Sequence, residues 1–342
     1  MKNIFTNKTI LVTGGAGSIG SEIVRQLLKL NPKQVRVLDN RETAEFNLKE
    51  ELKGYDNVRV LIGDIRDESR LEHALHEVDI VFHTAALKHV PLCEYNPFEA
   101  IKTNVYGTQN VISAALANNV EKVVNISTDK VTNTINTLGA TKLLSERLIA
   151  AAQYFKGNKR TTFSSVRFGN VVGSQGSVIQ LFRDQIKRDL RVTITDHSMT
   201  RFIMSNAQAV NHVLETAEIM QGGEIFILKM PVFKLSDLAE ITIEASALKH
   251  NLRPKDIKQN IIGIRPGEKL YEDLMTQEEA QYALETNKMF IVLPPIYVPG
   301  YNIKPRKYSG AIKTNIKKYS SKEIKPLSRE KLKKLMMEED LI

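Results

Sequence analysis

The chain has 342 residues, which is enough for one large domain or two smaller ones with a sizeable core. Its residues are 42% hydrophobic and 25% charged, as in an ordinary globular protein, and no apolar run approaches the ~20 residues that span a bilayer. The N-terminus is too polar for a signal peptide, and Cys93 is the single cysteine. These features predict a cytoplasmic protein without disulfides or membrane insertion.

The net charge of +9 is concentrated near the C-terminus. Residues 301–342 contain 12 Lys and Arg against 5 Asp and Glu, so they carry +7 and the rest of the chain carries about +2. Such a basic tail contacts phosphate or an acidic partner, or packs as a solvated arm on a neighbouring subunit. Because the excess is confined to this tail, we expect no nucleic-acid partner.

Short β-branched runs alternate with stretches of helical period through the first half of the chain. The runs lie at residues 9–12, 35–38, 58–61, 79–83, 122–126 and 162–166. Between them, apolar residues recur at helical spacing, as at Ile23, Leu27 and Leu30. This alternation predicts an α/β fold of Rossmann type, a doubly wound parallel sheet with helices on both faces and ligands beyond the carboxyl ends of the strands.

The pattern becomes irregular after Phe168, where Gly and Ser cluster. Ser236-Asp237 is expected to cap a helix that runs toward Lys249, and Ser328 to cap a last short helix. We therefore expect a dinucleotide-binding Rossmann domain at 1–168 and a smaller substrate-binding region at 169–300, parts of which return to the Rossmann core. The basic tail at 301–342 follows.

A glycine loop follows the first strand and precedes a helix that begins near Ser18. Gly14, Gly17 and Gly20 allow a tight turn in which backbone amides approach a pyrophosphate, and the positive end of the helix points at that anion. The alternative, a tight turn without a ligand, is disfavoured by this strand–loop–helix context. Ile19 belongs to the same predicted cofactor site.

A carboxylate 19 residues beyond Gly20 completes the dinucleotide pattern. Asp39, followed by Asn40, is placed to bind both adenosine ribose hydroxyls, which favours NAD because a carboxylate repels a 2′-phosphate. Arg41 is placed to reach such a phosphate, so NADP stays open. Asp64 and Ile65 follow the third strand and are expected at the adenine, with a plain turn as the alternative.

Two further segments carry the chemistry. Ser127-Thr128-Asp129-Lys130 follows the fifth strand, and Leu138-Gly139-Ala140-Thr141-Lys142 lies further on. This arrangement resembles the extended short-chain dehydrogenases/reductases, and more closely the UDP-N-acetylglucosamine 4,6-dehydratase family of polysaccharide-biosynthesis enzymes. The resemblance rests on blocks in the family's order and spacing at residues 63–67, 83–91, 94–97, 103–108, 167–171, 173–177, 199–202 and 265–270.

The resemblance implies a sugar-nucleotide lyase that uses NAD without net consumption. Hydride leaves carbon 4 of the sugar, water is eliminated across carbons 5 and 6, and hydride returns to carbon 6. Asp129 is implied as the acid and Lys130 as the base, with Thr128 beside them and Lys142 on the nicotinamide ribose. The pKa of Lys130 must fall for this role, and burial and nearby cations are expected to lower it.

Leu138 stands where the superfamily has the tyrosine of Tyr-x-x-x-Lys, and leucine has no proton to exchange. This argues against an ordinary reductase and against the nearest alternative, a UDP-N-acetylhexosamine 4-epimerase. Lys142 and Asp129-Lys130 argue against a second alternative, a non-catalytic binding module. The resemblance also implies a UDP-sugar substrate and a homo-oligomer.

The resemblance assigns further residues to the site. Arginine suits the diphosphate because its fork matches phosphate oxygens in two contacts. No histidine shows metal-ligand spacing, so we predict no metal. The implied cofactor contacts are Ala85, Ala86, Lys88 and Asn104, and the implied substrate contacts are Lys88, His89, Asn170, Ser177, Thr195, Arg201, Arg265 and Glu268.

Overall fold

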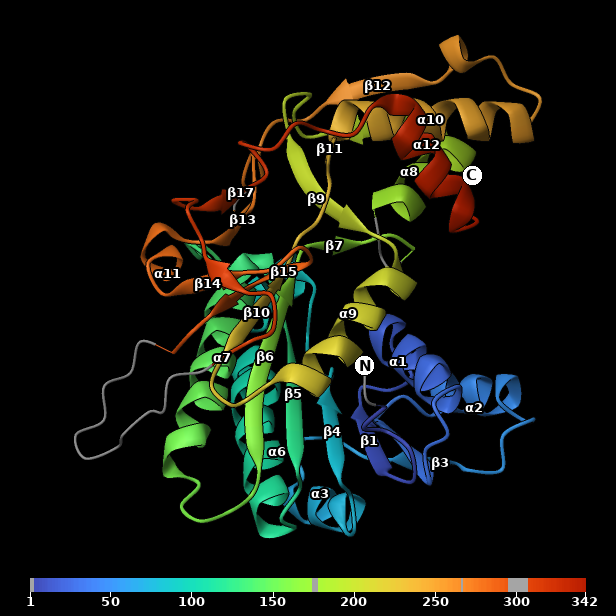
Figure 1. The fold of residues 1–342 in the computed structure, drawn as a ribbon. Helices are drawn as coiled ribbons and strands as arrows, with labels where there is room; N and C mark the ends of the chain where they lie inside the picture. Colours follow the sequence, from blue (N-terminus) through green and yellow to red (C-terminus); the bar gives the residue numbers. More distant parts are fainter. Residues whose placement is uncertain (1–2, 174–177, 266, 295–306) are drawn as a thin grey trace.

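A computed structural model describes residues 3–173, 178–265, 267–294 and 307–342. Its largest element is a ten-stranded sheet in the order β16-β14-β15-β10-β6-β5-β4-β1-β2-β3 (Figure 1). Strands β1 to β6 and β10 pair in parallel, whereas β14, β15 and β16 pair antiparallel at one edge. The parallel strands are β1 (Thr9–Thr13), β2 (Gln34–Asp39), β3 (Val58–Ile62), β4 (Ile80–His83), β5 (Lys122–Thr128), β6 (Thr162–Phe168) and β10 (Ile225–Leu228).

The predicted Rossmann fold is confirmed. All six β-branched runs of the first half form strands within two residues of the expected bounds. The apolar side chains of β1, β2, β4, β5 and β6 are buried between two helical layers, whereas those of β3, at the sheet edge, are partly exposed. The strand order reverses at β1, between β2 and β4, and a doubly wound sheet binds its ligand beyond the carboxyl ends of the strands at such a point.

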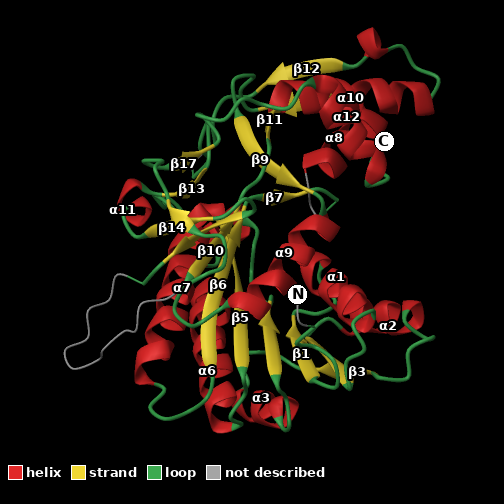
Figure 2. Ribbon diagram, in the orientation of Figure 1, coloured by secondary structure: helices red, strands yellow, loops and turns green. Residues whose placement is uncertain are grey.

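Helices cover both faces of this sheet (Figure 2). One face packs against helices α1, α2 and α9 and the other against α3, α6 and α7, and each interface holds its own hydrophobic core. Short helices α4, α5 and η1 connect β4 to α6. The bounds are α1 (Ser18–Leu28), α2 (Glu42–Glu51), α3 (Glu68–Leu75), α4 (Val90–Tyr95), α5 (Pro97–Ile101), η1 (Lys102–Tyr106), α6 (Gly107–Ala117), η2 (Asp129–Val131), α7 (Thr137–Phe155) and α9 (Asn206–Ile219).

A smaller unit lies beyond the carboxyl ends of the parallel strands (Figure 1). Two small sheets, β7-β9-β11 and β8-β12, and helices α8, α10 and α12 enclose a separate hydrophobic core. The bounds are β7 (Asn170–Val171), α8 (Val178–Asp189), β8 (Arg191–Ile194), β9 (Thr200–Met204), β11 (Val232–Lys234), α10 (Leu235–Lys249), η3 (Pro254–Asp256), β12 (Lys258–Ile261) and α12 (Arg329–Glu338).

The chain crosses between these units several times. Helix α9 and strand β10 lie against the Rossmann core, as do β14 (Ala283–Glu285), β15 (Met289–Val292) and β16 (Ile312–Lys313). Strand β13 (Asp273–Met275) pairs with β17 (Tyr319–Ser320), and α11 (Gln277–Ala280) follows β13.

The C-terminal segment packs on its own chain. Leu332 and Met336, one helical turn apart on α12, are fully buried against the core of the smaller unit. Ser328 caps α12, as predicted, by accepting a hydrogen bond from the Lys331 amide. The other predicted cap is wrong, because α10 begins at Leu235 and its N-cap is Lys234.

Among the described residues, no helix is both long enough and apolar enough to cross a bilayer.

Candidate active site

A cavity of about 820 Å³ lies beyond the carboxyl ends of β1 to β6, between the Rossmann core and the smaller unit. The glycine loop and the β2 and β3 ends line it on one side, and Val172, Ile179, Phe233 and Leu238 of the smaller unit line another. The cavity contains most of the predicted site, namely Gly14, Gly17, Ser18, Ile19, Gly20, Asp39, Asn40, Arg41, Asp64, Ile65, Ala85, Ala86, Lys88, His89, Thr128, Lys130, Lys142 and Asn170.

The glycine loop is shaped by close backbone contacts. Gly14 has a φ of +65°, and a Cβ there would lie 2.6 Å from the Ala85 amide nitrogen. A Cβ on Gly20 would lie 2.3 Å from the Gly14 carbonyl oxygen. Gly17 caps α1 without a side chain, and the first turn of α1 has no acidic residue, so the amide end of the helix is suited to an anion.

Asp39 ends β2 at the cavity with its carboxylate already engaged. Its Oδ1 accepts from the Arg41 backbone and Nε at 3.1 and 3.0 Å, and its Oδ2 accepts from Arg41 Nη2 at 3.0 Å and from the Ala16 amide at 3.2 Å. A fork of this kind places a cation and an anion together where an adenosine ribose would bind.

Asp64 and Asn104 hold the walls of the cavity. Asp64 accepts from Arg66 and from Asn40, which ties the ends of β2 and β3 together. Asn104 is buried rather than cavity-lining, and its amide accepts from the Leu87 N–H at 2.9 Å and donates to the Leu87 carbonyl at 3.1 Å. It therefore fixes the segment after β4, and its direct contact with a cofactor stays a prediction.

The end of β5 carries the proposed proton-transfer groups. Thr128 and Lys130 line the cavity, whereas Asp129 between them is buried and points away from it. Asp129 Oδ1 accepts from Thr128 Oγ1 at 2.8 Å and from Lys130 Nζ at 3.0 Å. Two cavity-facing donors thus converge on one buried carboxyl oxygen.

Lys142 reaches the cavity from α7. Its Nζ donates to the Ile126 carbonyl at 2.6 Å, and burial, partly opposed by Glu146, lowers its pKa to about 8. Leu138, one turn earlier, also lines the cavity and packs against Cys93 and Ala100. The tyrosine position therefore presents only an apolar surface to the site.

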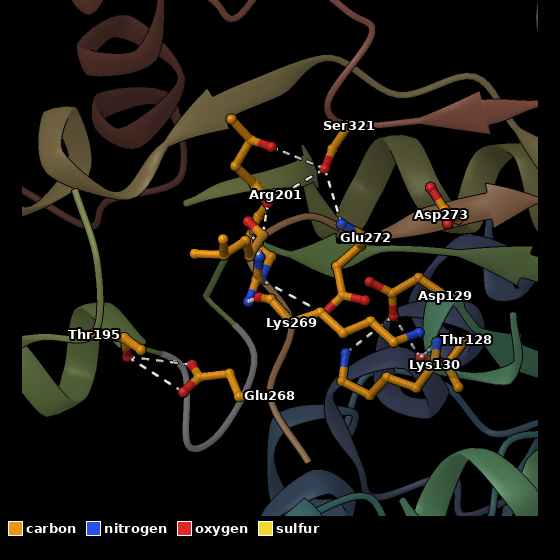
Figure 3. Close-up of polar contacts among 12 residues, drawn as sticks. Thr128, Asp129, Lys130, Thr195, Arg201, Glu268, Lys269, Glu272, Asp273 and Ser321 are labelled. Atoms are coloured by element: carbon orange, nitrogen blue, oxygen red, sulfur yellow. Dashed lines mark hydrogen bonds and ion pairs between the residues drawn. The ribbon is translucent and has the colours of Figure 1, made fainter. Parts of the chain in front are cut away.

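Charged residues from the second half of the chain gather behind Asp129 (Figure 3). Glu272, directly before β13, is buried with its side chain directed toward Asp129, and Arg201 Nε lies 3.6 Å from its Oε1. Lys269 donates from Nζ to the Thr132 carbonyl at 2.7 Å. These residues surround the Asp129-Lys130 pair.

This cluster overturns the expected decrease in the pKa of Lys130. Burial is the largest single effect and lowers that pKa, but the charges of Asp129 and Glu272 and the hydrogen bond to Asp129 together outweigh it, so the net pKa is raised. The sequence argument counted burial and nearby cations but not a second carboxylate.

The predicted substrate residues fall into two groups. Lys88, His89 and Asn170 line the cavity, as given above. Thr195 instead donates to both Glu268 carboxylate oxygens at 3.3 Å, close to the Arg265 amide, which donates to Glu268 Oε2 at 3.4 Å.

Arg201 lies apart from the cavity wall and donates to the Thr200, Lys269 and Leu270 carbonyls. Its proposed contact with a diphosphate stays a prediction, and Ser177 lies outside the described residues.

Glu272 is the principal site residue that the sequence argument missed. It lies two positions beyond the last family block, and nothing in its local pattern marks it. Within the described ranges, no group of three or more His, Cys, Asp and Glu side chains is arranged to hold a metal. The predicted absence of a metal stays a prediction.

The Rossmann sheet, the glycine loop and the Thr128–Lys130/Lys142 arrangement define an enzyme of the extended short-chain dehydrogenase/reductase class that acts on sugar nucleotides, a class that includes dehydratases and epimerases. Residues 10–294 match the family model described as polysaccharide biosynthesis protein. The chain belongs to this family.

Three relatives are similar to this chain over most of its length. An uncharacterized membrane protein of Methanocaldococcus jannaschii is 53% identical over 99% of this chain and 98% of its own length. The inverting UDP-N-acetylglucosamine 4,6-dehydratase of Campylobacter jejuni is 42% identical over 86% and 85%. A UDP-glucose 4-epimerase of Rickettsia felis is 38% identical over 99% and 98%.

Solved structures show the same fold. Pen from Bacillus thuringiensis superposes with a TM-score of 0.91 at 46% identity and covers 99% of both chains. The dTDP-glucose 4,6-dehydratase DesIV from Streptomyces venezuelae gives a TM-score of 0.65 at 24% identity, over 75% of this chain and 88% of its own. The second likeness shows the shared fold alone.

Proposed function

We propose that this protein is a UDP-N-acetylglucosamine 4,6-dehydratase that uses NAD as a catalytic group. The observation that carries the proposal is the pair Thr128 and Lys130 on the cavity wall, both bonded to the buried carboxyl of Asp129, with an apolar Leu138 in the tyrosine position. The 42% identity to the Campylobacter jejuni enzyme supports this choice of substrate.

The residues of the glycine loop fit a dinucleotide. A side chain at Gly14 or Gly20 would collide with backbone atoms, and the loop opens onto the cavity at the amide end of α1. Asp39 would hold the adenosine ribose of NAD. Because Arg41 already pairs with Asp39, a 2′-phosphate would find a guanidinium beside that carboxylate, so NADP is the competing cofactor to be measured.

When bound, NAD supplies the hydride acceptor for carbon 4 and the hydride donor for carbon 6. The chain itself supplies proton transfers. Moving one proton along the 3.0 Å hydrogen bond from Lys130 Nζ to Asp129 Oδ1 converts an ion pair into a neutral amine and a neutral acid. The amine then takes the proton from carbon 5, and the acid delivers a proton to the hydroxyl that leaves carbon 6. When hydride returns to carbon 6, the Lys130 ammonium gives a proton back to carbon 5, which in deuterated water is a deuteron.

A 4-epimerase is the second candidate, and one observation favours it. The Rickettsia felis epimerase matches this chain along almost its full length. Leu138 disfavours it, because leucine has no proton to exchange with the oxygen on carbon 4 as hydride leaves one face of that carbon and returns to the other. A binding module without catalysis is the third candidate.

One experiment separates these functions. The protein is incubated with UDP-N-acetylglucosamine and NAD in deuterated water and followed by NMR. We expect a 4-keto-6-deoxy sugar with deuterium at carbon 5, and the same spectrum reads the configuration there. UDP-N-acetylgalactosamine without deuterium would establish the epimerase, and an unchanged sugar would refute catalysis on this substrate.

Variants connect the result to the site. Lys130→Ala is expected to lose deuterium incorporation while NAD still binds, because Lys130 is the proposed base and lies on the cavity wall away from the glycine loop and the β2 end. Lys53→Ala is the matched control and should keep wild-type turnover, because this lysine lies just beyond the C-terminal end of α2 with its side chain 69% exposed. Normal turnover by Lys130→Ala would remove Lys130 from the mechanism.

A further inference from the structure

Two buried carboxyl groups face each other behind the cavity (Figure 3). Asp129 is 1% exposed and Glu272 is 5% exposed. Asp129 Oδ2 and Glu272 Oε2 are both buried, and neither has a hydrogen-bond partner among the described residues. A buried acceptor without a donor is costly, so two of them on facing carboxyls call for a hydrogen between them.

Three cationic side chains from different segments surround the two carboxyl groups. Lys130 contacts Asp129 from η2, Arg201 lies beside Glu272 from β9, and Lys269 approaches from the segment before β13. The next carboxylate, Asp273, accepts from Asn133 Nδ2 at 3.1 Å through Oδ2, and its Oδ1 is buried without a hydrogen-bond partner among the described residues.

Burial and the charge of Asp129 raise the pKa of Glu272, although the three cations oppose this. Two negative charges in one buried site repel each other strongly, so one of the two groups retains a proton.

We propose that Glu272 is a positioning residue that shares one proton with Asp129 and so keeps Asp129 supplied with the proton it donates during elimination. This inference rests on the proposed function, in which Asp129 acts as the acid. Glu272 does not line the cavity and acts only through Asp129. It also gives a lysine with a raised pKa a proton acceptor, since Asp129 can take the Lys130 proton at Oδ1 while the shared proton moves from Oδ2 to Glu272.

Glu272→Gln tests the proposal because it keeps the shape of the side chain and removes its charge. A glutamine amide donates to Asp129 and stabilises the ionised carboxylate, so the shared proton is lost at a lower pH. We expect kcat to fall by about 10–100-fold with KM and the NAD affinity unchanged, and the basic limb of the pH profile to move down by about one unit or more. Glu285→Gln, a half-buried glutamate paired with Lys229 on β14, is the matched control.

A second measurement does not depend on turnover. The infrared C=O stretch of a protonated carboxyl is recorded at neutral pH for wild type, Glu272→Gln and Asp129→Asn, with the circular dichroism spectrum as a check on folding. The wild type should show the band of one protonated carboxyl more than either variant, because the remaining carboxyl in each variant lies among cations that favour its ionised form. Buried Glu45 contributes equally to all three spectra. Glu272→Asp should restore part of the difference.

The outcomes are separable. If the wild type forms no 4-keto sugar, the proposed function fails, and the infrared band still decides whether the proton is shared. If the wild type is active but Glu272→Gln keeps its pH profile, or the wild-type band is no stronger than that of the variants, the carboxyls do not share a proton and the inference is overturned. If Glu272→Gln raises KM and loses the circular dichroism spectrum of the folded protein, Glu272 supports the fold and the inference that it acts only through a shared proton is overturned.

Discussion

Gly20→Ala places a methyl group where the structure has no room for one. The new Cβ would lie 2.3 Å from the Gly14 carbonyl oxygen and 2.7 Å from the Gly15 Cα, and ordinary contacts begin near 3.4 Å. Both atoms belong to the backbone of the glycine loop and cannot rotate away. The loop and α1 must therefore separate by about 1 Å, and a misplacement of that size costs on the order of 100-fold in a positioned interaction.

We expect the variant to bind NAD about 100-fold more weakly, which is about 2.7 kcal/mol, as measured by isothermal titration calorimetry. Gly54→Ala is the matched control, because no atom lies within 4 Å of its Cβ position. Its affinity should equal that of the wild type. An affinity of Gly20→Ala within about threefold of the wild type would refute the argument that the loop holds the pyrophosphate by close backbone approach.

Three further changes probe the stability of the chain and its cofactor choice. Arg167 is buried and donates five hydrogen bonds. Arg167→Met should therefore lower the free energy of unfolding by about 3–5 kcal/mol and the melting temperature by about 5 °C. Arg188→Met, at an exposed position, should leave the melting temperature unchanged within error. Burial raises the pKa of Glu45 to about 7, so the folded state holds a proton that the unfolded chain releases. The free energy of unfolding should therefore fall by about 2 kcal/mol as the pH rises from about 4.5 to 7. Urea titrations should show that Glu45→Gln removes this pH dependence and that Glu42→Gln, at an exposed position, keeps it. Arg41→Ala should weaken NADP by about tenfold or more and NAD by little, and an unchanged ratio of the two dissociation constants would argue against the guanidinium as a phosphate contact.

The cofactor end of the site was predictable from the sequence because its geometry is local. A strand, a turn that only glycine fits and a helix follow one another within 20 residues, and backbone sterics decide their shape. Asp39 is placed by the next strand of the same sheet. These constraints act between neighbouring elements, so a pattern of residue types is sufficient to find them.

The C-terminal segment contains an apolar helix face within a strongly basic sequence. Leu332 and Met336 stand four residues apart among lysines, which is the spacing of one apolar helix face. The structure buries both against the smaller unit. The net charge of a segment therefore says little about whether its apolar stripe is packed.

The environment of Asp129 was not predictable, because its neighbours are distant in the chain. Thr132 Oγ1 donates to the Asp273 carbonyl across 141 positions, and this contact brings the segment with Glu272 against the end of β5. No local pattern encodes such a contact. The pKa of Lys130 was misjudged for the same reason, since its sign depends on a carboxylate supplied by that segment.

The convergence on Asp129 explains how this site can work without a tyrosine at position 138. In the proposed reaction, one proton leaves the hydroxyl on carbon 4 and another is delivered to the hydroxyl on carbon 6. Thr128 and Lys130 both line the cavity, and Thr128 Oγ1 and Lys130 Nζ both donate to Asp129 Oδ1, at 2.8 and 3.0 Å. The proton that Asp129 receives from Lys130 goes to the leaving hydroxyl, and the proton released from the carbon 4 hydroxyl can return through Thr128 to the Asp129-Lys130 pair, so the pair gains and loses equal numbers of protons in one turnover. A reductase has to take its proton from solvent at every turnover, so the enclosed position of Asp129 favours a lyase over an oxidoreductase in this fold.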